Sequence, residues 1–186
     1  KGNIVAIQRF APNAAAAMGP ASSVAKSGAD AVLIAQGGTV LKAIGPTLSL
    51  DGMGRDKVRL LGTGLWDDPG LEREASLQGG WYAAPAPNAD ADFSARYRTA
   101  FGAAPVQLSS LAYDAMSLVA LLSQGPAYHR FTPAALMDPN GFSGVNGIFR
   151  FNADGTSERG LAVLEMTPNG PIVVSPAPTT FQGKNS

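Results

Sequence analysis

The stretch Ala31-Val-Leu-Ile-Ala-Gln-Gly-Gly-Thr39 decides the fold, because an apolar run ends abruptly in two glycines and a helix-forming segment follows. A second apolar run that ends in glycines comes later in the chain, Val58-Arg-Leu-Leu-Gly-Thr-Gly-Leu-Trp66. Runs that are apolar on both faces are typical of parallel strands buried between helices. In such sheets, ligands bind at the loops just past the carboxyl ends of the strands. The two stretches therefore predict a parallel sheet with a ligand-binding edge.

The elements around these runs predict a β-α-β-α-β unit with right-handed crossovers and helices on both faces of the sheet. We expect its strands near residues 3–10, 31–35, 58–61 and 77–83. The first helix should begin near Pro20 and end at Gly28. The second should be capped by Thr39, with Pro46 kinking it.

The second half of the chain predicts helices and then antiparallel strands. Ala84-Pro-Ala-Pro87 is the expected crossing between two lobes. Apolar residues at helical spacing predict helices, and turn residues between short apolar runs predict an antiparallel meander. The helices fall at 90–101, 110–124 and 131–137, and the strands of the meander at 147–151, 161–166 and 172–174. The fold class is therefore a three-layer α-β-α arrangement with a mainly parallel sheet and antiparallel strands at the C-terminal end.

Composition excludes several classes of function. The charges balance, with 14 Lys and Arg against 14 Asp and Glu, so no basic surface for nucleic acid is expected. The chain has no cysteine, and its only histidine, His129, leaves carboxylates alone as metal ligands. No G-x-S-x-G nucleophile motif is present. We expect a binding domain rather than an enzyme, with no catalytic residue, metal ion or cofactor.

Two loops are the candidate ligand site. The first holds Gln36, Gly37, Gly38 and Thr39, and the second holds Gly64, Leu65, Trp66 and Asp67. The glycines either let a ligand approach the backbone or only turn the chain. Trp66 either covers an apolar ligand group or belongs to the core. Asp67 and Asp68 either receive an ammonium group or cap the helix that follows Pro69.

The order of several motifs resembles the type I periplasmic binding proteins of the Leu/Ile/Val-binding kind. The matching stretches are Val32–Gly38, Leu60–Gly64, Gln78-Gly-Gly-Trp-Tyr82, Phe93…Tyr97…Phe101, Tyr113-Asp-Ala115 and Gly141-Phe-Ser-Gly-Val-Asn-Gly147 leading into Phe149-Arg-Phe151. Gly64-Leu-Trp-Asp-Asp68 and Gly160-Leu-Ala-Val163 look like the subgroup labelled penicillin-binding protein activators.

The resemblance implies a two-lobed receptor, longer than this chain, whose lobes close on a small ligand by a hinge motion. Residues 1–87 would be most of the second lobe, 88–140 helices returning to the first lobe, and 141–186 the closing strands and tail. The second-lobe ligand contacts of the family fall on Gln36–Thr39 and Gly64–Asp67. Gln36 stands where amino-acid receptors often have an aromatic residue.

The function implied is an extracytoplasmic receptor that binds an amino acid or similar ligand for an ABC importer. It would be periplasmic or lipid-anchored, although Lys1-Gly-Asn-Ile-Val-Ala-Ile7 shows no signal-peptide pattern. The alternative is a non-transport protein of the same fold that regulates a peptidoglycan synthase. A receptor should direct Trp66 into a cleft, whereas an interaction protein should pack or expose it. We also expect a dimer, or an N-terminal lobe, to cover the apolar helices between residues 90 and 124.

Overall fold

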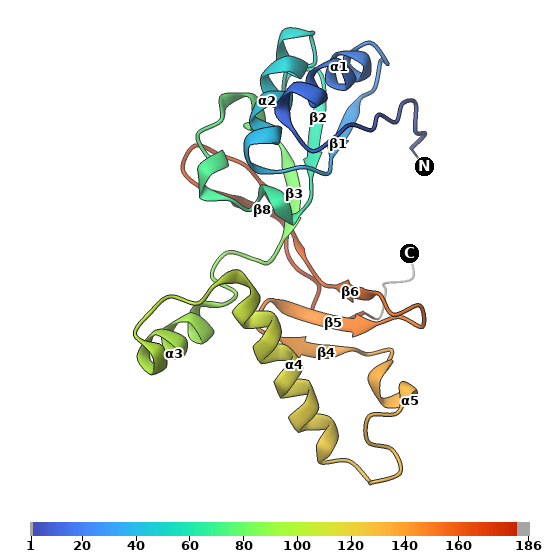
Figure 1. The fold of residues 1–186 in the computed structure, drawn as a ribbon, viewed down its shortest axis with the longest axis vertical. Coiled ribbons are helices and arrows are strands. Elements are labelled where there is room, and N and C mark those ends of the chain that lie inside the picture. Colours follow the sequence, from blue (N-terminus) through green and yellow to red (C-terminus); the bar gives the residue numbers. More distant parts are fainter. Residues whose placement is uncertain (1, 182–186) are drawn as a thin grey trace. The chain divides into compact units, whose positions relative to one another are not determined.

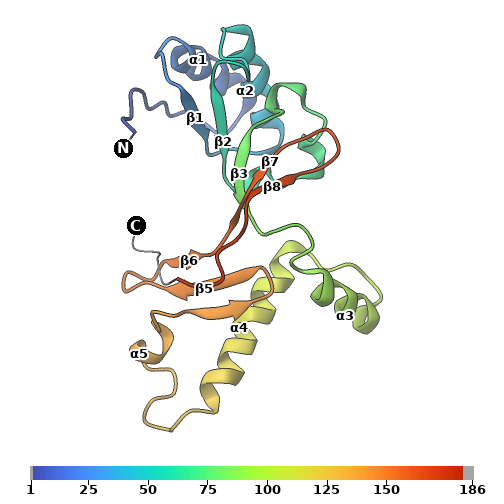
Figure 2. The ribbon, with the colours of Figure 1, turned by 180° about the vertical axis from the view of Figure 1, so that it is seen from behind.

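The computed structural model describes residues 2–181 and divides the chain into two compact units (Figures 1 and 2). Unit 1 is formed by the residues up to Ala84 together with Val163–Ser175. Unit 2 is formed by Pro85–Ala162 and the residues from Pro176 onward. Among the described residues, no helix is long and apolar enough to cross a membrane.

The core of unit 1 is a five-stranded sheet of order β1-β2-β3-β7-β8. Its first three strands are parallel, with Val32 opposite Leu60 and Leu61 opposite Trp81, and β7 and β8 are antiparallel. The mainly parallel sheet predicted from the two apolar runs is thus confirmed. The strands are β1 (Ala31–Ile34), β2 (Arg59–Gly62), β3 (Trp81–Ala84), β7 (Ala162–Glu165) and β8 (Ile172–Ser175).

Helices α1 (Ala14–Ala25) and α2 (Gly38–Leu50) pack against each other on one side of this sheet (Figures 1 and 2). Their buried residues include Ala17, Ala21, Leu41, Ile44 and Leu48. On the other side, Leu33 of β1 is 65% exposed. The predicted α/β fold class, with a mainly parallel sheet and antiparallel strands toward the C-terminal end, is confirmed.

Two predicted helix starts are wrong. Asn13 caps α1, since its Oδ1 accepts the Ala16 N–H at 2.9 Å, and the helix runs through Pro20 instead of beginning there. Gly37 is the N-cap of α2, so Thr39 lies inside the helix rather than capping it. In both cases the helix begins earlier in the chain, and Pro20 and Pro46 are both accommodated inside helices.

Two predicted strands are also corrected. Residues 3–10 form no strand and are largely exposed, with Ile4 at 81%, because a strand needs a hydrogen-bonded neighbour and these residues have none in the sheet. The strand predicted at 77–83 is limited to β3. The 3₁₀-helix η3 (Ala75–Leu77) and Gly79, at φ +77°, occupy its first part.

Unit 2 contains helices and a separate antiparallel sheet of order β4-β5-β6. The three helices confirm the predicted ones: α3 (Ala91–Phe101), α4 (Gln107–Ser123) and α5 (Pro133–Leu136). The strands are β4 (Phe142–Gly144), β5 (Gly147–Phe151) and β6 (Ser157–Arg159). The predicted single meander is therefore wrong, since β5 belongs to this sheet while β7 and β8 belong to unit 1. Between β6 and β7, Gly160 packs closely against two residues, since a Cβ there would lie 2.6 Å from Ile148 and 3.0 Å from Pro178.

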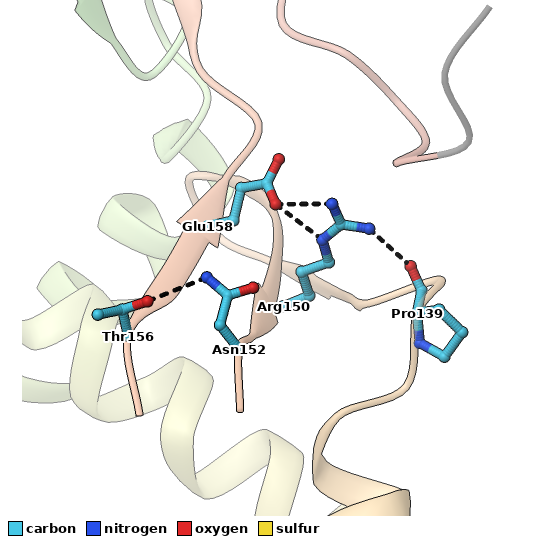
Figure 3. Close-up of polar contacts among 5 residues, drawn as sticks. All are labelled: Pro139, Arg150, Asn152, Thr156 and Glu158. Atoms are coloured by element: carbon cyan, nitrogen blue, oxygen red, sulfur yellow. Dashed lines mark hydrogen bonds and ion pairs between the residues drawn. The ribbon is translucent and has the colours of Figure 1, made fainter. Parts of the chain in front are cut away.

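Arg150 of β5 holds three segments of unit 2 together (Figure 3). Its Nε and Nη2 donate to Glu158 Oε2 at 2.9 and 2.7 Å, and its Nη1 donates to the Pro139 carbonyl at 3.2 Å. The guanidinium also lies 4.5 Å from the ring centroid of Phe181. The contacts of Arg150 therefore join β6, the segment before β4, and the C-terminal tail.

Candidate ligand-binding site

The two predicted loops lie next to each other at the carboxyl ends of β1 and β2. Loop 1 is Gln36–Thr39, and loop 2 is Gly64–Asp67, which contains the 3₁₀-helix η1 (Gly64–Trp66). A Cβ on Gly37 would lie 2.5 Å from the Leu65 carbonyl oxygen and 3.0 Å from its Cβ, so this approach requires glycine. A Cβ on Gly64 would lie 3.5 Å from the Ala83 carbonyl oxygen of β3, an ordinary van der Waals contact. The structure thus brings three strand ends together.

Loop 1 presents the N-terminus of a regular helix. Its N-cap, Gly37, has no side-chain hydrogen bond to the first turn, and the first backbone bond runs from the Leu41 N–H to the Gly37 carbonyl. The N–H groups before Leu41 have no partner within the helix, and the helix dipole adds partial positive charge there. Gln36 is half-buried and Thr39 is exposed beside them. Loop 1 can therefore hold an anionic group such as a carboxylate.

Trp66 in loop 2 belongs to the core of unit 1. Its exposed fraction is 0%, and its Nε1–H donates to the Ile34 carbonyl of β1 at 3.2 Å. The ring fits only because Gly62 and Gly80 lack side chains, since a Cβ on either residue would overlap it. Of the two roles considered for Trp66, the structure selects the core residue. The Trp66 ring therefore packs under loop 2 inside unit 1, and it is too buried to contact a ligand directly.

Asp67 and Tyr82 form the main polar contact behind loop 2. The Tyr82 side chain in β3 is 3% exposed, and Tyr82 and Asp67 each act on the pKa of the other. Burial raises the pKa of Asp67 above its ordinary value of 3.8, Tyr82 lowers it by hydrogen bonding, and the nearby Glu72 raises it. Burial and the charges of Asp67 and Glu72 also raise the pKa of Tyr82. Asp67 is still exposed at its outer side, so its charge is available to a ligand.

The other residues of loop 2 have simpler surroundings. Leu65 is 60% exposed. Asp68 caps the 3₁₀-helix η2 (Pro69–Leu71), since its Oδ1 accepts the Gly70 N–H at 2.8 Å. For Asp68 the capping alternative is confirmed, which leaves Asp67 as the acidic residue of the candidate site.

The sequence analysis missed Tyr82. It follows the glycines of the Gln78–Tyr82 stretch, and only the register that places it opposite Gly62 shows that it faces loop 2. His129 lies in the exposed loop between α4 and α5. Among residues 2–181 no group of three or more His, Cys, Asp or Glu side chains is placed to hold a metal ion.

Comparison with known proteins gives one family match. A family profile described as periplasmic binding protein matches residues 1–171. A comparison with curated proteins gives no match.

Several solved structures share the fold at low identity. One is a branched-chain amino acid ABC transporter protein from Rhodospirillum rubrum, 18% identical with a TM-score of 0.65, matching 88% of this chain and 49% of that one. Another is the leucine-binding protein LivK from Thermotoga maritima, which is 17% identical with a TM-score of 0.56. The match covers 89% of this chain and 48% of LivK. A third is LpoA from Haemophilus influenzae, which is 13% identical with a TM-score of 0.59. The match covers 85% of this chain and 29% of LpoA. The chain therefore spans at most about half the length of these proteins.

Proposed function

Because this chain belongs to the periplasmic binding protein family, we propose that it supplies one half of an extracytoplasmic receptor site for a small polar ligand such as an amino acid. The observation that carries the proposal is the close approach of loop 1 and loop 2 at Gly37 and Leu65. Gly37 lets the two loops come this close, and adjacent parallel strands bring both loops to one edge of the sheet.

The charges of the two loops suit a zwitterion. The N-terminus of α2 offers N–H groups and partial positive charge to a carboxylate. Asp67 offers an exposed negative charge to an ammonium group. We propose direct contacts from Gln36, Gly37, Gly38, Thr39, Gly64, Leu65 and Asp67, with Trp66 supporting the backbone. The rest of the receptor and the membrane subunits of an ABC importer would be its partners.

The experiment is an NMR titration of the 186-residue chain with a panel of amino acids. Half a site should bind weakly, with a dissociation constant on the order of 1 mM, or about −4 kcal/mol. We expect shifts of the backbone amides at residues 36–39 and 64–67. Gly37→Ala should abolish these shifts, because its Cβ would displace Leu65, while Gly54→Ala, with nothing within 4 Å, should keep them. Shifts confined to other residues, or none with any amino acid, would contradict the proposal.

A second candidate is an interaction protein that regulates a peptidoglycan synthase. Two observations favour it: Trp66 is packed, as expected of an interaction module, and LpoA is among the similar structures. Its test is stimulation of a purified peptidoglycan synthase by this chain. Equal stimulation by wild type and Gly37→Ala, together with no amino-acid binding, would favour this candidate over the receptor.

A further inference from the structure

Three asparagines of the chain are followed directly by glycine: Asn140, Asn146 and Asn169. Asparagine is a thermolabile residue, because the backbone nitrogen of the next residue can attack its carboxamide. Glycine in that next position favours the attack, since it has no side chain and its backbone moves easily. A fold that holds either the carboxamide or the glycine nitrogen slows the reaction, and the structure holds the three pairs to different degrees.

The Asn146–Gly147 pair is held at both residues. The Asn146 Nδ2 donates to the Ser110 Oγ of α4 at 2.9 Å, which ties the carboxamide to a helix. Gly147 already belongs to β5 and is paired with Gly144 of β4. A Cβ on Gly147 would lie 2.8 Å from the Gly160 carbonyl oxygen, so its surroundings are crowded. Neither reacting group is free to move.

The Asn140–Gly141 pair is held by its own turn. The Asn140 N–H and Nδ2 both donate to Asp138 Oδ1, at 2.8 and 3.1 Å. The Gly141 N–H donates to the Asp138 carbonyl at 2.9 Å. A Cβ on Gly141 would lie 2.5 Å from the Phe149 carbonyl oxygen and 2.7 Å from the Phe181 ring. Asn140 is exposed, but its carboxamide and the following nitrogen are both engaged.

The Asn169–Gly170 pair lies in the turn between β7 and β8 of unit 1 (Figure 2). Asn169 is exposed, and within the described part of the chain its carboxamide makes no hydrogen bond. The Gly170 N–H donates to the Thr167 carbonyl at 3.2 Å, the long end of the usual range. A Cβ on Gly170 would have nothing within 4 Å. This pair alone among the three combines a free carboxamide with open space around the glycine.

We propose that Asn169 is a site of spontaneous deamidation, with water as the co-reactant. The Gly170 nitrogen attacks the Asn169 Cγ, a new N–C bond forms, and the Cγ–Nδ2 bond breaks. The electron pair of that bond leaves with Nδ2, which takes up the proton lost by Gly170 and departs as ammonia. Water then opens the resulting succinimide at either carbonyl, giving aspartate or isoaspartate. This inference goes beyond the proposed function and does not depend on it.

The isoaspartate product should loosen the β7–β8 turn. Besides the Gly170 N–H bond, the turn contains a bond from the Thr167 hydroxyl to the Gly170 carbonyl at 2.5 Å. Isoaspartate adds a carbon to the main chain between these two residues, so both bonds cannot be kept. The product also carries a new negative charge. Because β8 is the last strand of its sheet, we expect its amides to lose protection from hydrogen exchange in the modified chain.

Ageing of the whole chain at mildly alkaline pH, followed by proteolysis and peptide mass spectrometry, tests the proposal. We expect the acid to appear first at Asn169. Conversion at Asn140 and Asn146 should be slower by about fivefold or more, since the carboxamide bond there must break as well. Hydrogen exchange of the aged chain should be faster in β8 and unchanged in β5.

Two variants and an unfolded sample are the controls. Asn169→Gln should remove the first product, because the longer side chain closes the ring poorly, and Asn140→Gln should leave the rate at Asn169 unchanged. In urea the three pairs should convert at similar rates, because the fold no longer holds two of them. Conversion of Asn140 or Asn146 as fast as Asn169 in the folded chain would overturn the proposal. So would the same order of rates in urea, or an Asn169 that converts only there.

Discussion

At the scale of single residues, Asp67 is held in an environment that opposes its charge. Burial raises its folded-state pKa above 3.8, so the protonated carboxyl favours folding. This contribution is fully present below 3.8 and is lost as the pH rises through the raised pKa. At neutral pH, the ionised Asp67 thus lowers the free energy of unfolding. Ionised groups in such unfavourable surroundings are typical of binding sites.

Asp67→Asn should therefore stabilise the fold at neutral pH, because it removes a charge that burial and Glu72 disfavour. We expect a higher unfolding temperature than wild type at about pH 7 and a smaller difference as the pH falls through the raised pKa of the wild-type carboxyl. Thermal unfolding followed by circular dichroism measures both. A lower unfolding temperature for the variant at neutral pH would mean that Asp67 serves mainly as a structural acceptor for Tyr82.

Gly62 is the residue on which the burial of Trp66 depends. Gly62→Ala should destabilise unit 1 by about 1–3 kcal/mol, the cost of overpacking a core, because the new Cβ would overlap the indole ring. Gly54→Ala is the matched control, with nothing within 4 Å of its Cβ, and should change stability little. Urea unfolding of both variants gives the comparison. Equal stability of Gly62→Ala and wild type would show that the ring can move aside.

At the scale of elements, the small sheet of unit 2 depends on Arg150. Arg150→Ala should destabilise this unit by about 1–2 kcal/mol, because it removes a two-pronged contact with Glu158 and the bond to Pro139. Glu158→Gln removes only the ion pair, which is partly exposed, and should cost less than about 1 kcal/mol. Hydrogen exchange of the β5 and β6 amides measures both variants. An equal loss in the two would assign the whole effect to the ion pair.

Local patterns predicted the strands and helices that fill the core, but not the pairing between distant segments. The apolar runs at 31–35 and 58–61 are strands because both are buried on one face and paired in parallel. The equally apolar segment 3–10 has no partner, and pattern alone gives no information on partners. The glycines of loop 1 predicted either a ligand contact or a turn of the chain. The close approach of Gly37 to Leu65 and the place of Tyr82 beside loop 2 follow instead from the pairing of β1, β2 and β3.

At the scale of the whole molecule, α3 and α4 expose an apolar surface. Phe101, Leu108 and Met116 are 70%, 70% and 66% exposed. Phe93 contacts Tyr97 and Tyr113, and Tyr97 contacts Phe101, in a row of rings that lines a groove with Arg96. Exposed apolar surface costs roughly 25 cal/mol per Å², so such a surface favours association. The similar solved structures have at least as much chain again that this one does not match.

We therefore expect the 186-residue chain to self-associate through this surface when it is studied alone. Light scattering across a concentration series should show a species larger than the 19.0 kDa monomer. A Phe101→Ser and Leu108→Ser double variant should shift it toward the monomer, because both side chains belong to the exposed surface. Leu50→Ser is the matched control: Leu50 is 87% exposed but lies at the end of α2 in unit 1, so its loss should leave association unchanged. A monodisperse wild-type monomer at every concentration would contradict the prediction, because it would show that the exposed apolar surface of α3 and α4 does not drive association.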